Sequence, residues 1–208
     1  MSDPHFVTLE VFTDYVCPWC YLASDSVAKL EAIDPDVEIQ WTPFPLHPDT
    51  PGEGLDLRQL LGPNLDQIHQ RLFSIMDEVG LPYAPQRVMT YNSRMAQELG
   101  MWGNNRENGK DLHKALYRAY FVENKNISEK QVLLDVVSSV GMDAHLASEV
   151  LENRTFSNAV DEAWQRARAM NISGVPSFIG GRYLTTGYQS LENLQQFIDH
   201  VRIAQSGA

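Results

Sequence analysis

The chain has 208 residues, enough to bury one sizeable core or a core with a large insertion. Its 43% of hydrophobic and 21% of charged residues are ordinary for a folded protein and exclude extended disorder. The formal net charge of −11 argues against nucleic acid and anionic membrane surfaces as partners, because both repel a negative protein. The sequence has neither a secretion signal nor an apolar run long enough to span a membrane, so we expect a cytoplasmic protein.

The start of the chain predicts a β–α–β unit. The segment "FVTLEVF" (6–12) is rich in β-branched and apolar residues and predicts a buried strand. The segment "YLASDSVAKLEAI" (21–33) has apolar residues at helical spacing, and "VEIQWTPF" (37–44) predicts a second strand. The Pro- and Gly-rich "PLHPDTPGEG" (45–54) predicts a loop, which we interpret as a domain boundary.

The middle of the chain, residues 55–150, has helical periodicity. Its apolar residues recur at spacings of three and four, which predicts amphipathic helices with one buried face. The clearest such stretches are residues 65–79, 112–119 and 132–140. We therefore expect this part of the chain to be an all-helical insertion.

The last part of the chain predicts the order α–β–β–α. Apolar residues at helical spacing predict a helix within residues 156–170. The segment "ISGVPSFIGGRYLTTG" (172–187) predicts a turn, a strand, a hairpin turn at Gly180–Gly181 and a second strand. A final helix is predicted over residues 191–201, where leucine, isoleucine, phenylalanine and valine share one face.

Both cysteines of the chain stand in "DYVCPWCY" (14–21), three residues apart. On the first turn of a helix, side chains at this spacing face the same way, at a separation that a disulfide tolerates. Cys17 would lie at the helix N-terminus, where free N–H groups stabilise the nucleophilic thiolate. Cys20, one turn inside, suits the resolving role. Pro18 stiffens the turn, and Trp19 offers an apolar surface to a substrate.

Two other interpretations of the cysteine pair remain open. A structural zinc site needs four ligands, whereas the chain has no second cysteine pair and no histidines at ligand-pair spacing, so we expect no metal. Two buried and unreactive core cysteines would also produce the pattern, because free cysteine is often buried.

The segment "SGVPSF" (173–178) places a Val-Pro pair directly before a predicted strand. It resembles the cis-proline loop that faces the CxxC motif in thioredoxin-like proteins. In these proteins the residue before proline presents its backbone to an extended substrate, and the resemblance assigns this role to Val175 beside Pro176. A trans-proline turn that opens an edge strand is the alternative. His47 and Tyr15 are further candidates for the border of the site.

The predicted element order, with CxxC at the start of the first helix, resembles the thioredoxin fold with the helical insertion of the DsbA family. The segments "TDYVCPWCY", "LHPDTPGEG", "NSRMAQELG" and "NISGVPSFIGGRY" resemble the FrnE-like branch of that family. The resemblance implies an α/β protein with a discontinuous thioredoxin-like domain, residues 1–54 and 151–208. Residues 55–150 would form the DsbA-like helical insertion.

Two acidic residues near the motif have open roles. Many thioredoxin-like proteins carry a buried acid six residues before the first cysteine, which passes protons to the resolving thiol, but this chain has Val11 there. Glu10 is either that proton relay, shifted by one residue, or a surface residue at a strand end. Asp14 raises the pKa of the Cys17 thiol, caps the helix or is simply solvated, and we favour the cap.

These features predict a thiol–disulfide oxidoreductase or isomerase that forms a mixed disulfide at Cys17 and resolves it with Cys20. Its substrates would be thiols or disulfides, with no tightly bound cofactor and with glutathione as a redox partner. The alternative enzyme class is a glutathione-dependent transferase or isomerase. Kappa-class glutathione transferases and 2-hydroxychromene-2-carboxylate isomerases share the thioredoxin fold with a helical insertion that this sequence resembles, but they typically have serine at the Cys17 position. A non-catalytic chaperone or binding module is a third hypothesis. The oligomeric state is open, because the insertion suits a substrate lid as well as a dimer face.

Overall fold

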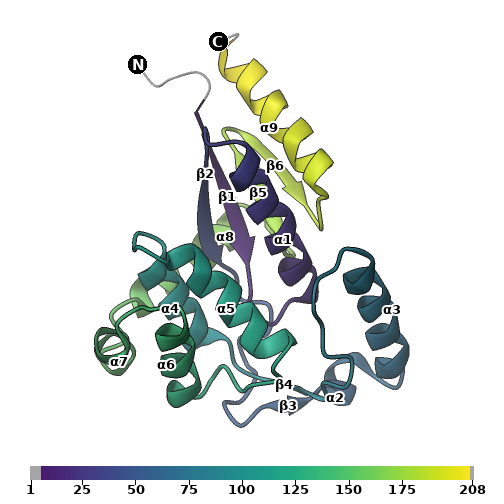
Figure 1. Ribbon diagram of the computed structural model, residues 1–208, viewed down its shortest axis with the longest axis vertical. Coiled ribbons are helices and arrows are strands. Elements are labelled where there is room, and N and C mark those ends of the chain that lie inside the picture. Colours follow the sequence, from purple (N-terminus) through teal and green to yellow (C-terminus); the bar gives the residue numbers. More distant parts are fainter. Residues whose placement is uncertain (1–5, 207–208) are drawn as a thin grey trace.

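The computed structural model describes residues 6–206 (Figure 1). The strands are β1 (Val7–Thr13), β2 (Val37–Pro43), β3 (Leu55–Asp56), β4 (Met89–Thr90), β5 (Ser177–Gly180) and β6 (Tyr183–Thr186). The helices are α1 (Pro18–Ile33), α2 (Leu57–Leu61), α3 (Leu65–Glu78), α4 (Arg94–Gly103), α5 (Gly109–Phe121), α6 (Lys130–Ser139), α7 (Ala144–Glu152), α8 (Ser157–Ala169) and α9 (Leu191–Ser206). Within residues 6–206, no helix is long and apolar enough to cross a membrane.

A four-stranded mixed sheet forms the upper part of the molecule in Figure 1. Its strand order is β2-β1-β5-β6, with β1 parallel to β2 and antiparallel to β5. The central strand β1 therefore joins the start of the chain to its end. This is the α/β thioredoxin-like arrangement that the sequence predicts.

Helices cover both faces of the sheet, and the alternation of β1 decides which residues face which helix. Leu9 and Val11 pack with residues of α1 and α9, including Val27 and Ile198. Phe12 points to the other face, where it packs against Ala167 of α8. Each of these large apolar side chains contributes about 1.5–3 kcal/mol through its burial. The sheet is thus a central layer held between two helical layers.

The insertion occupies the lower part of Figure 1 and contains α2 to α7. It is not all-helical, because β3 and β4 form a short antiparallel pair in which Leu55 lies opposite Thr90. A two-residue strand is too short to show any periodicity in the sequence, which explains why it was not predicted. The helix α7 continues to Glu152, past the expected end of the insertion at residue 150.

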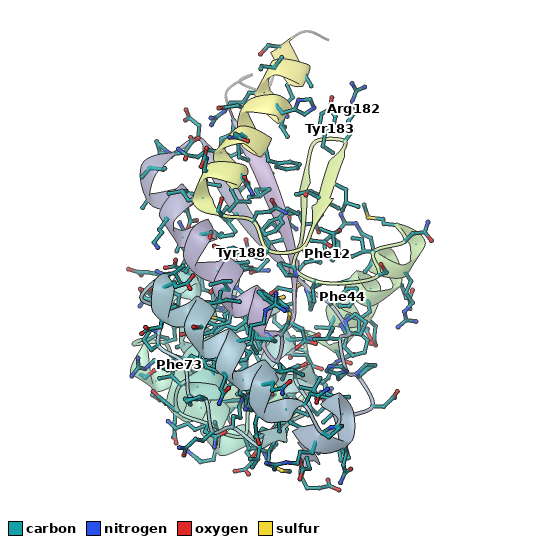
Figure 2. All side chains as sticks on the ribbon, turned by 90° about the vertical axis from the view of Figure 1, so that its right-hand side faces the viewer. Phe12, Phe44, Phe73, Arg182, Tyr183 and Tyr188 are labelled. Atoms are coloured by element: carbon teal, nitrogen blue, oxygen red, sulfur yellow. The ribbon has the colours of Figure 1, made fainter. Side chains whose placement is uncertain are left out.

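The hairpin between β5 and β6 differs by one residue from its prediction. Gly180 pairs with Tyr183, so the two-residue turn consists of Gly181 and Arg182. Only Gly181 needs the left-handed conformation, with φ of 56°. Gly180 instead allows α9 to approach, because a Cβ there would lie 2.8 Å from Val201 Cγ2. Figure 2 shows this turn at the tip of the hairpin, far from the insertion.

Candidate active site

The CxxC motif lies where β1 ends and α1 begins, as predicted. Cys17 is the N-cap residue of α1 with an extended backbone (φ −88°, ψ 115°), and Pro18 takes the first helical position. The carbonyl of Cys17 accepts hydrogen bonds from the N–H groups of Cys20 and Tyr21, both at 3.1 Å. The sulfur of Cys17 therefore lies at the N-terminal, positive end of the α1 helix dipole.

The cis-proline loop meets the first cysteine of the motif. The peptide bond between Val175 and Pro176 is cis. Cys17 Sγ donates a hydrogen bond to the Val175 carbonyl oxygen at 3.5 Å. The antiparallel pairing of β1 with β5 brings these residues together, although they stand 158 positions apart. Both cysteines are free thiols.

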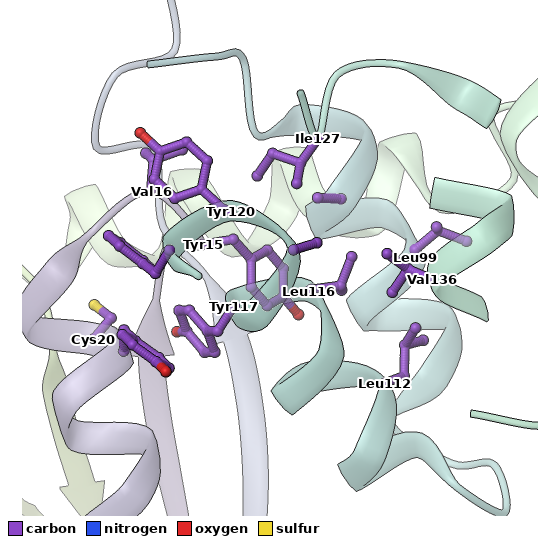
Figure 3. Packing of buried hydrophobic residues seen from close by; sticks show 14 of the residues in the cluster. Tyr15, Val16, Cys20, Leu99, Leu112, Leu116, Tyr117, Tyr120, Ile127 and Val136 are labelled. Atoms are coloured by element: carbon purple, nitrogen blue, oxygen red, sulfur yellow. The ribbon is translucent and has the colours of Figure 1, made fainter. Parts of the chain in front are cut away.

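The second cysteine lies beneath the first, at the edge of the largest core cluster (Figure 3). Cys20 is 1% exposed, and burial together with the neighbouring Cys17 holds its pKa well above the usual range. A hydrogen bond with the Thr13 hydroxyl acts in the opposite direction. Thr13 in turn shares a hydrogen bond with the hydroxyl of Tyr117 on α5. Hydroxyl groups, rather than a carboxylate, therefore adjoin the Cys20 thiol.

Glu10 has neither of the roles expected from the sequence. It is buried, and its carboxylate accepts hydrogen bonds from Thr42 Oγ1 at 2.7 Å and from both terminal nitrogens of Arg166 on α8. Strand alternation places Glu10 on the α8 face of the sheet, whereas Val11 and Cys20 lie on the α1 side. The proton-relay hypothesis for Glu10 is therefore wrong, and so is the surface-residue alternative.

Asp14 does not cap α1, contrary to our expectation, because Cys17 is the N-cap residue. The carboxylate of Asp14 instead accepts hydrogen bonds from the N–H groups of Val16 at 3.2 Å and Leu46 at 3.1 Å. Burial raises its pKa from 3.8 to about 6, opposed by hydrogen bonds that include one from Ser93. Asp14 thus ties the turn between β1 and α1, residues 14–17, to the loop after β2. We call residues 14–17 the active-site turn.

This raised pKa predicts a pH-dependent contribution to stability. The folded protein binds the Asp14 proton more tightly than the unfolded chain does, so the contribution is full below the unfolded pKa of 3.8. It is lost as the pH rises through about 6, a change of about 2 to 3 kcal/mol. Asp14→Asn cannot ionise and therefore lacks this loss. We expect its free energy of unfolding, minus that of the wild type, to rise by that amount as the pH increases from about 4 to about 7. Urea unfolding at several pH values measures it, and a pH-independent difference between the two proteins would contradict it.

A second buried network fixes Tyr15 against the insertion. The Tyr15 hydroxyl donates to His113 Nδ1 at 2.5 Å, and His113 Nε2 donates to the side-chain oxygen of Asn104 at 2.9 Å. Burial lowers the pKa of His113 to about 3, so its ring is neutral and can fill both roles. A Cβ at Gly100 would lie 2.2 Å from the Tyr15 hydroxyl. The active-site turn is thereby anchored to α4 and α5.

A groove of about 390 Å³ opens beside the motif, and we call it the active-site groove. Its lining includes Cys17, Trp19, His47, Leu60, Leu72 and Val175. Trp19 is 37% exposed, which confirms its expected place at the surface. The wall formed by α2 and α3 is largely apolar, but Arg87 and His69 also line the groove. No motif in the sequence indicated either of them, because each lies far from the cysteines along the chain.

The comparison with protein families shows to which family the chain belongs. Residues 8–199 match the family model described as "DSBA-like thioredoxin domain". The chain belongs to this family. Membership confirms the predicted resemblance to the DsbA family and the thioredoxin-like fold with its helical insertion. Within residues 6–206, no group of three or more His, Cys, Asp or Glu side chains is arranged to hold a metal ion.

Individual proteins and solved structures are similar to this chain over most of its length. The chain is 29% identical to the uncharacterized protein YwbO of Bacillus subtilis over 188 residues, which are 87% of this chain and 90% of YwbO. A "probable DsbA oxidoreductase" from Streptomyces coelicolor has a similar structure, with a TM-score of 0.85 and 22% identity over 94% of this chain and 89% of that one. The structure of a 2-hydroxychromene-2-carboxylate isomerase is also similar, with a TM-score of 0.75 and 18% identity over 96% of this chain and 98% of that one. At these identities the structures show the fold alone.

Proposed function

We propose that the protein catalyses thiol–disulfide exchange through Cys17 and Cys20. The observation that carries the proposal is the contact of Cys17 Sγ with the Val175 carbonyl in the lining of the active-site groove. Cys17 is 3% exposed, and Cys20, one helical turn further along α1, is 1% exposed and does not line the groove. A nucleophilic sulfur at a helix N-terminus and a second sulfur within reach are the two groups that exchange requires. The Val175 backbone supplies the edge against which an extended substrate binds.

The reductive direction proceeds in two steps. The Cys17 thiolate attacks one sulfur of a substrate disulfide, so that a mixed disulfide forms and the other substrate sulfur leaves as a thiolate. Cys20 then loses its proton and attacks Cys17, which forms the Cys17–Cys20 bond and releases the second substrate thiolate. The substrate gains two electrons and the enzyme loses two. Isomerisation needs only the first step and its reversal.

The direction in the cell depends on the reduction potential relative to that of the compartment. We propose a cytoplasmic location, where the couple would rest mostly reduced and would act as a reductase or isomerase. Glutathione is the proposed redox partner, with no tightly bound cofactor. The structural similarity to a 2-hydroxychromene-2-carboxylate isomerase supports a glutathione-dependent isomerase or transferase as the second candidate. The intact cysteine pair favours exchange over that candidate.

A glutathione redox titration of the purified protein tests the proposal. We expect one reversible two-electron transition, followed by thiol alkylation and mass measurement, that disappears in Cys17→Ser. A midpoint near about −120 mV would indicate an oxidase, and one near about −270 mV would indicate a reductant like thioredoxin. If no transition occurs and Cys17→Ser changes nothing, the proposal fails, and glutathione conjugation becomes the activity to assay.

A further inference from the structure

The active-site groove contains a buried cation, Arg87. Only 4% of this residue is exposed, although it lies in the wall of an open groove. Its guanidinium lies over the ring of Tyr120, with 4.4 Å from Cζ to the ring centroid. One terminal nitrogen donates to the Tyr120 hydroxyl and to the Met89 carbonyl, the latter at 3.3 Å. These contacts fix the side chain, and the aromatic ring attracts the cation, but none of them supplies a negative charge.

No carboxylate in residues 6–206 forms an ion pair with Arg87, and Nε of Arg87 has no hydrogen-bond partner. A buried charge without a counter-ion is destabilising, and most buried arginines in proteins are therefore paired. Even the half-exposed Arg166 and Arg154 of this chain pair with carboxylates, those of Glu10 and Glu98. Arg87 departs from it at the position where a ligand could supply the missing anion.

A second buried polar group of the groove also lacks a partner. His69 on α3 is 4% exposed, and its Nε2 has no hydrogen-bond partner. Burial lowers the pKa of His69, and the positive charge of Arg87 acts in the same direction. Two unsatisfied polar atoms in the lining of one largely apolar groove are unusual in a folded protein. At the rim, Arg71 is exposed and adds positive charge.

We propose that Arg87 and His69 form an anion subsite that binds the carboxylate of a low-molecular-weight disulfide while its sulfur reacts at Cys17. The inference rests on the proposed exchange function. The groove, at about 390 Å³, has the volume of a small-molecule site. A guanidinium is well suited to a carboxylate, which it holds through charge-assisted hydrogen bonds. Arg87 is recessed, so a terminal carboxylate of a small molecule reaches it more readily than a side chain on a folded protein surface does.

The test compares two disulfides that differ chiefly in one group, 3,3′-dithiodipropionate with carboxylates and 2-hydroxyethyl disulfide with hydroxyls. The measured quantity is the ratio of their second-order rate constants with reduced Cys17. In Arg87→Met we expect the ratio of the dithiodipropionate rate constant to the 2-hydroxyethyl disulfide rate constant to fall about tenfold from its wild-type value. The rate with the hydroxyl compound should not change. Arg182→Met removes the same charge at the hairpin tip (Figure 2) and should leave the ratio at its wild-type value.

The outcomes separate the subsite from the exchange function. If the wild type reacts with both compounds at Cys17 but Arg87→Met leaves the ratio unchanged, the subsite is refuted and the exchange function stands. If neither compound reacts, the exchange function fails. A measurement on the wild type alone covers the case that Arg87→Met does not fold. In that measurement, two thioethers that cannot exchange compete with a neutral alkylating reagent for access to Cys17 of the wild type. The carboxylate 3-(methylthio)propionate should slow the alkylation, and the alcohol 3-(methylthio)propanol should not. Equal protection by the two compounds would refute the subsite.

Discussion

Cys17→Ser should reduce disulfide exchange to the uncatalysed background, a loss of at least about 1,000-fold. Cys17 Sγ lines the active-site groove and contacts the Val175 carbonyl, so it is the sulfur that a substrate meets first. A serine hydroxyl at this position has neither the acidity nor the nucleophilicity of a thiol. The rate of reduction of 2-hydroxyethyl disulfide measures the effect.

Cys20→Ser should have a different effect, because it stops the reaction after the first step. The Cys17 mixed disulfide should accumulate and be visible by mass spectrometry, since no second thiol remains to resolve it. The two variants form a matched pair, as each replaces one sulfur by one oxygen. Mixed-disulfide accumulation in Cys17→Ser and none in Cys20→Ser would reverse the assigned roles. A wild type without exchange activity, together with unchanged binding of an unfolded protein by both variants, would support a binding module instead.

Glu98→Gln should lower the free energy of unfolding by about 2 to 4 kcal/mol. Glu98 on α4 is fully buried and accepts hydrogen bonds from Arg94 Nε at 2.9 Å and Arg154 Nε at 2.9 Å. Arg94 also donates to Asp161 on α8 at 2.7 Å, so this network joins the insertion to the sheet-covering helix. Glutamine preserves the shape of the side chain but leaves both arginines without their shared anion. The partial exposure of the arginines keeps the effect below that of a fully buried pair.

Thermal and urea unfolding measure this loss, with an expected decrease in Tm of about 5 to 15 °C. Glu152→Gln is the matched control, because Glu152 is an exposed carboxylate that pairs with Lys130 at the surface. Its removal should change stability by no more than about 1 kcal/mol. A Glu98→Gln variant as stable as that control would show that the buried network contributes no net stability. The exchange activity of folded Glu98→Gln should stay near the wild-type value, since Glu98 is absent from the groove lining.

The parts of the fold with a local signal were predictable from the sequence. The β-branched and apolar composition of β1, the helical spacing of α3 and the position of Cys17 at a helix start all depend on neighbouring residues. Glu10 shows the limit of such local patterns. Whether an acid in a strand faces α1 or α8 depends on the register of β1 against two partners, and its own neighbours do not reveal the Arg166 pairing.

The residues that anchor the active-site turn were less predictable. Tyr15 was only a candidate for the border of the site, and its hydrogen bond to His113 joins positions 98 residues apart. Arg87 and His69 have no motif around them, and their importance comes from burial without a partner. Burial of this kind is a property of the tertiary structure, because Arg87 lies over the rings of Tyr120 and Phe121 on α5 and His69 lies against Tyr83.

The two cysteines are synthesised long before the segment that covers Cys17 in the folded protein. Cys17 emerges from the ribosome about 8 to 30 seconds before Val175, which follows it by 158 residues. During that time β1 can pair with β2 but not with β5, so the central strand has one free edge. The nascent chain therefore carries two unshielded thiols while most of it is still being made. In a cell that makes this protein under oxidising stress, both thiols would be open to oxidation before β5 and the loop at Val175 reach them, and the neighbouring cysteine would allow a sulfenic acid to close into the reversible Cys17–Cys20 disulfide.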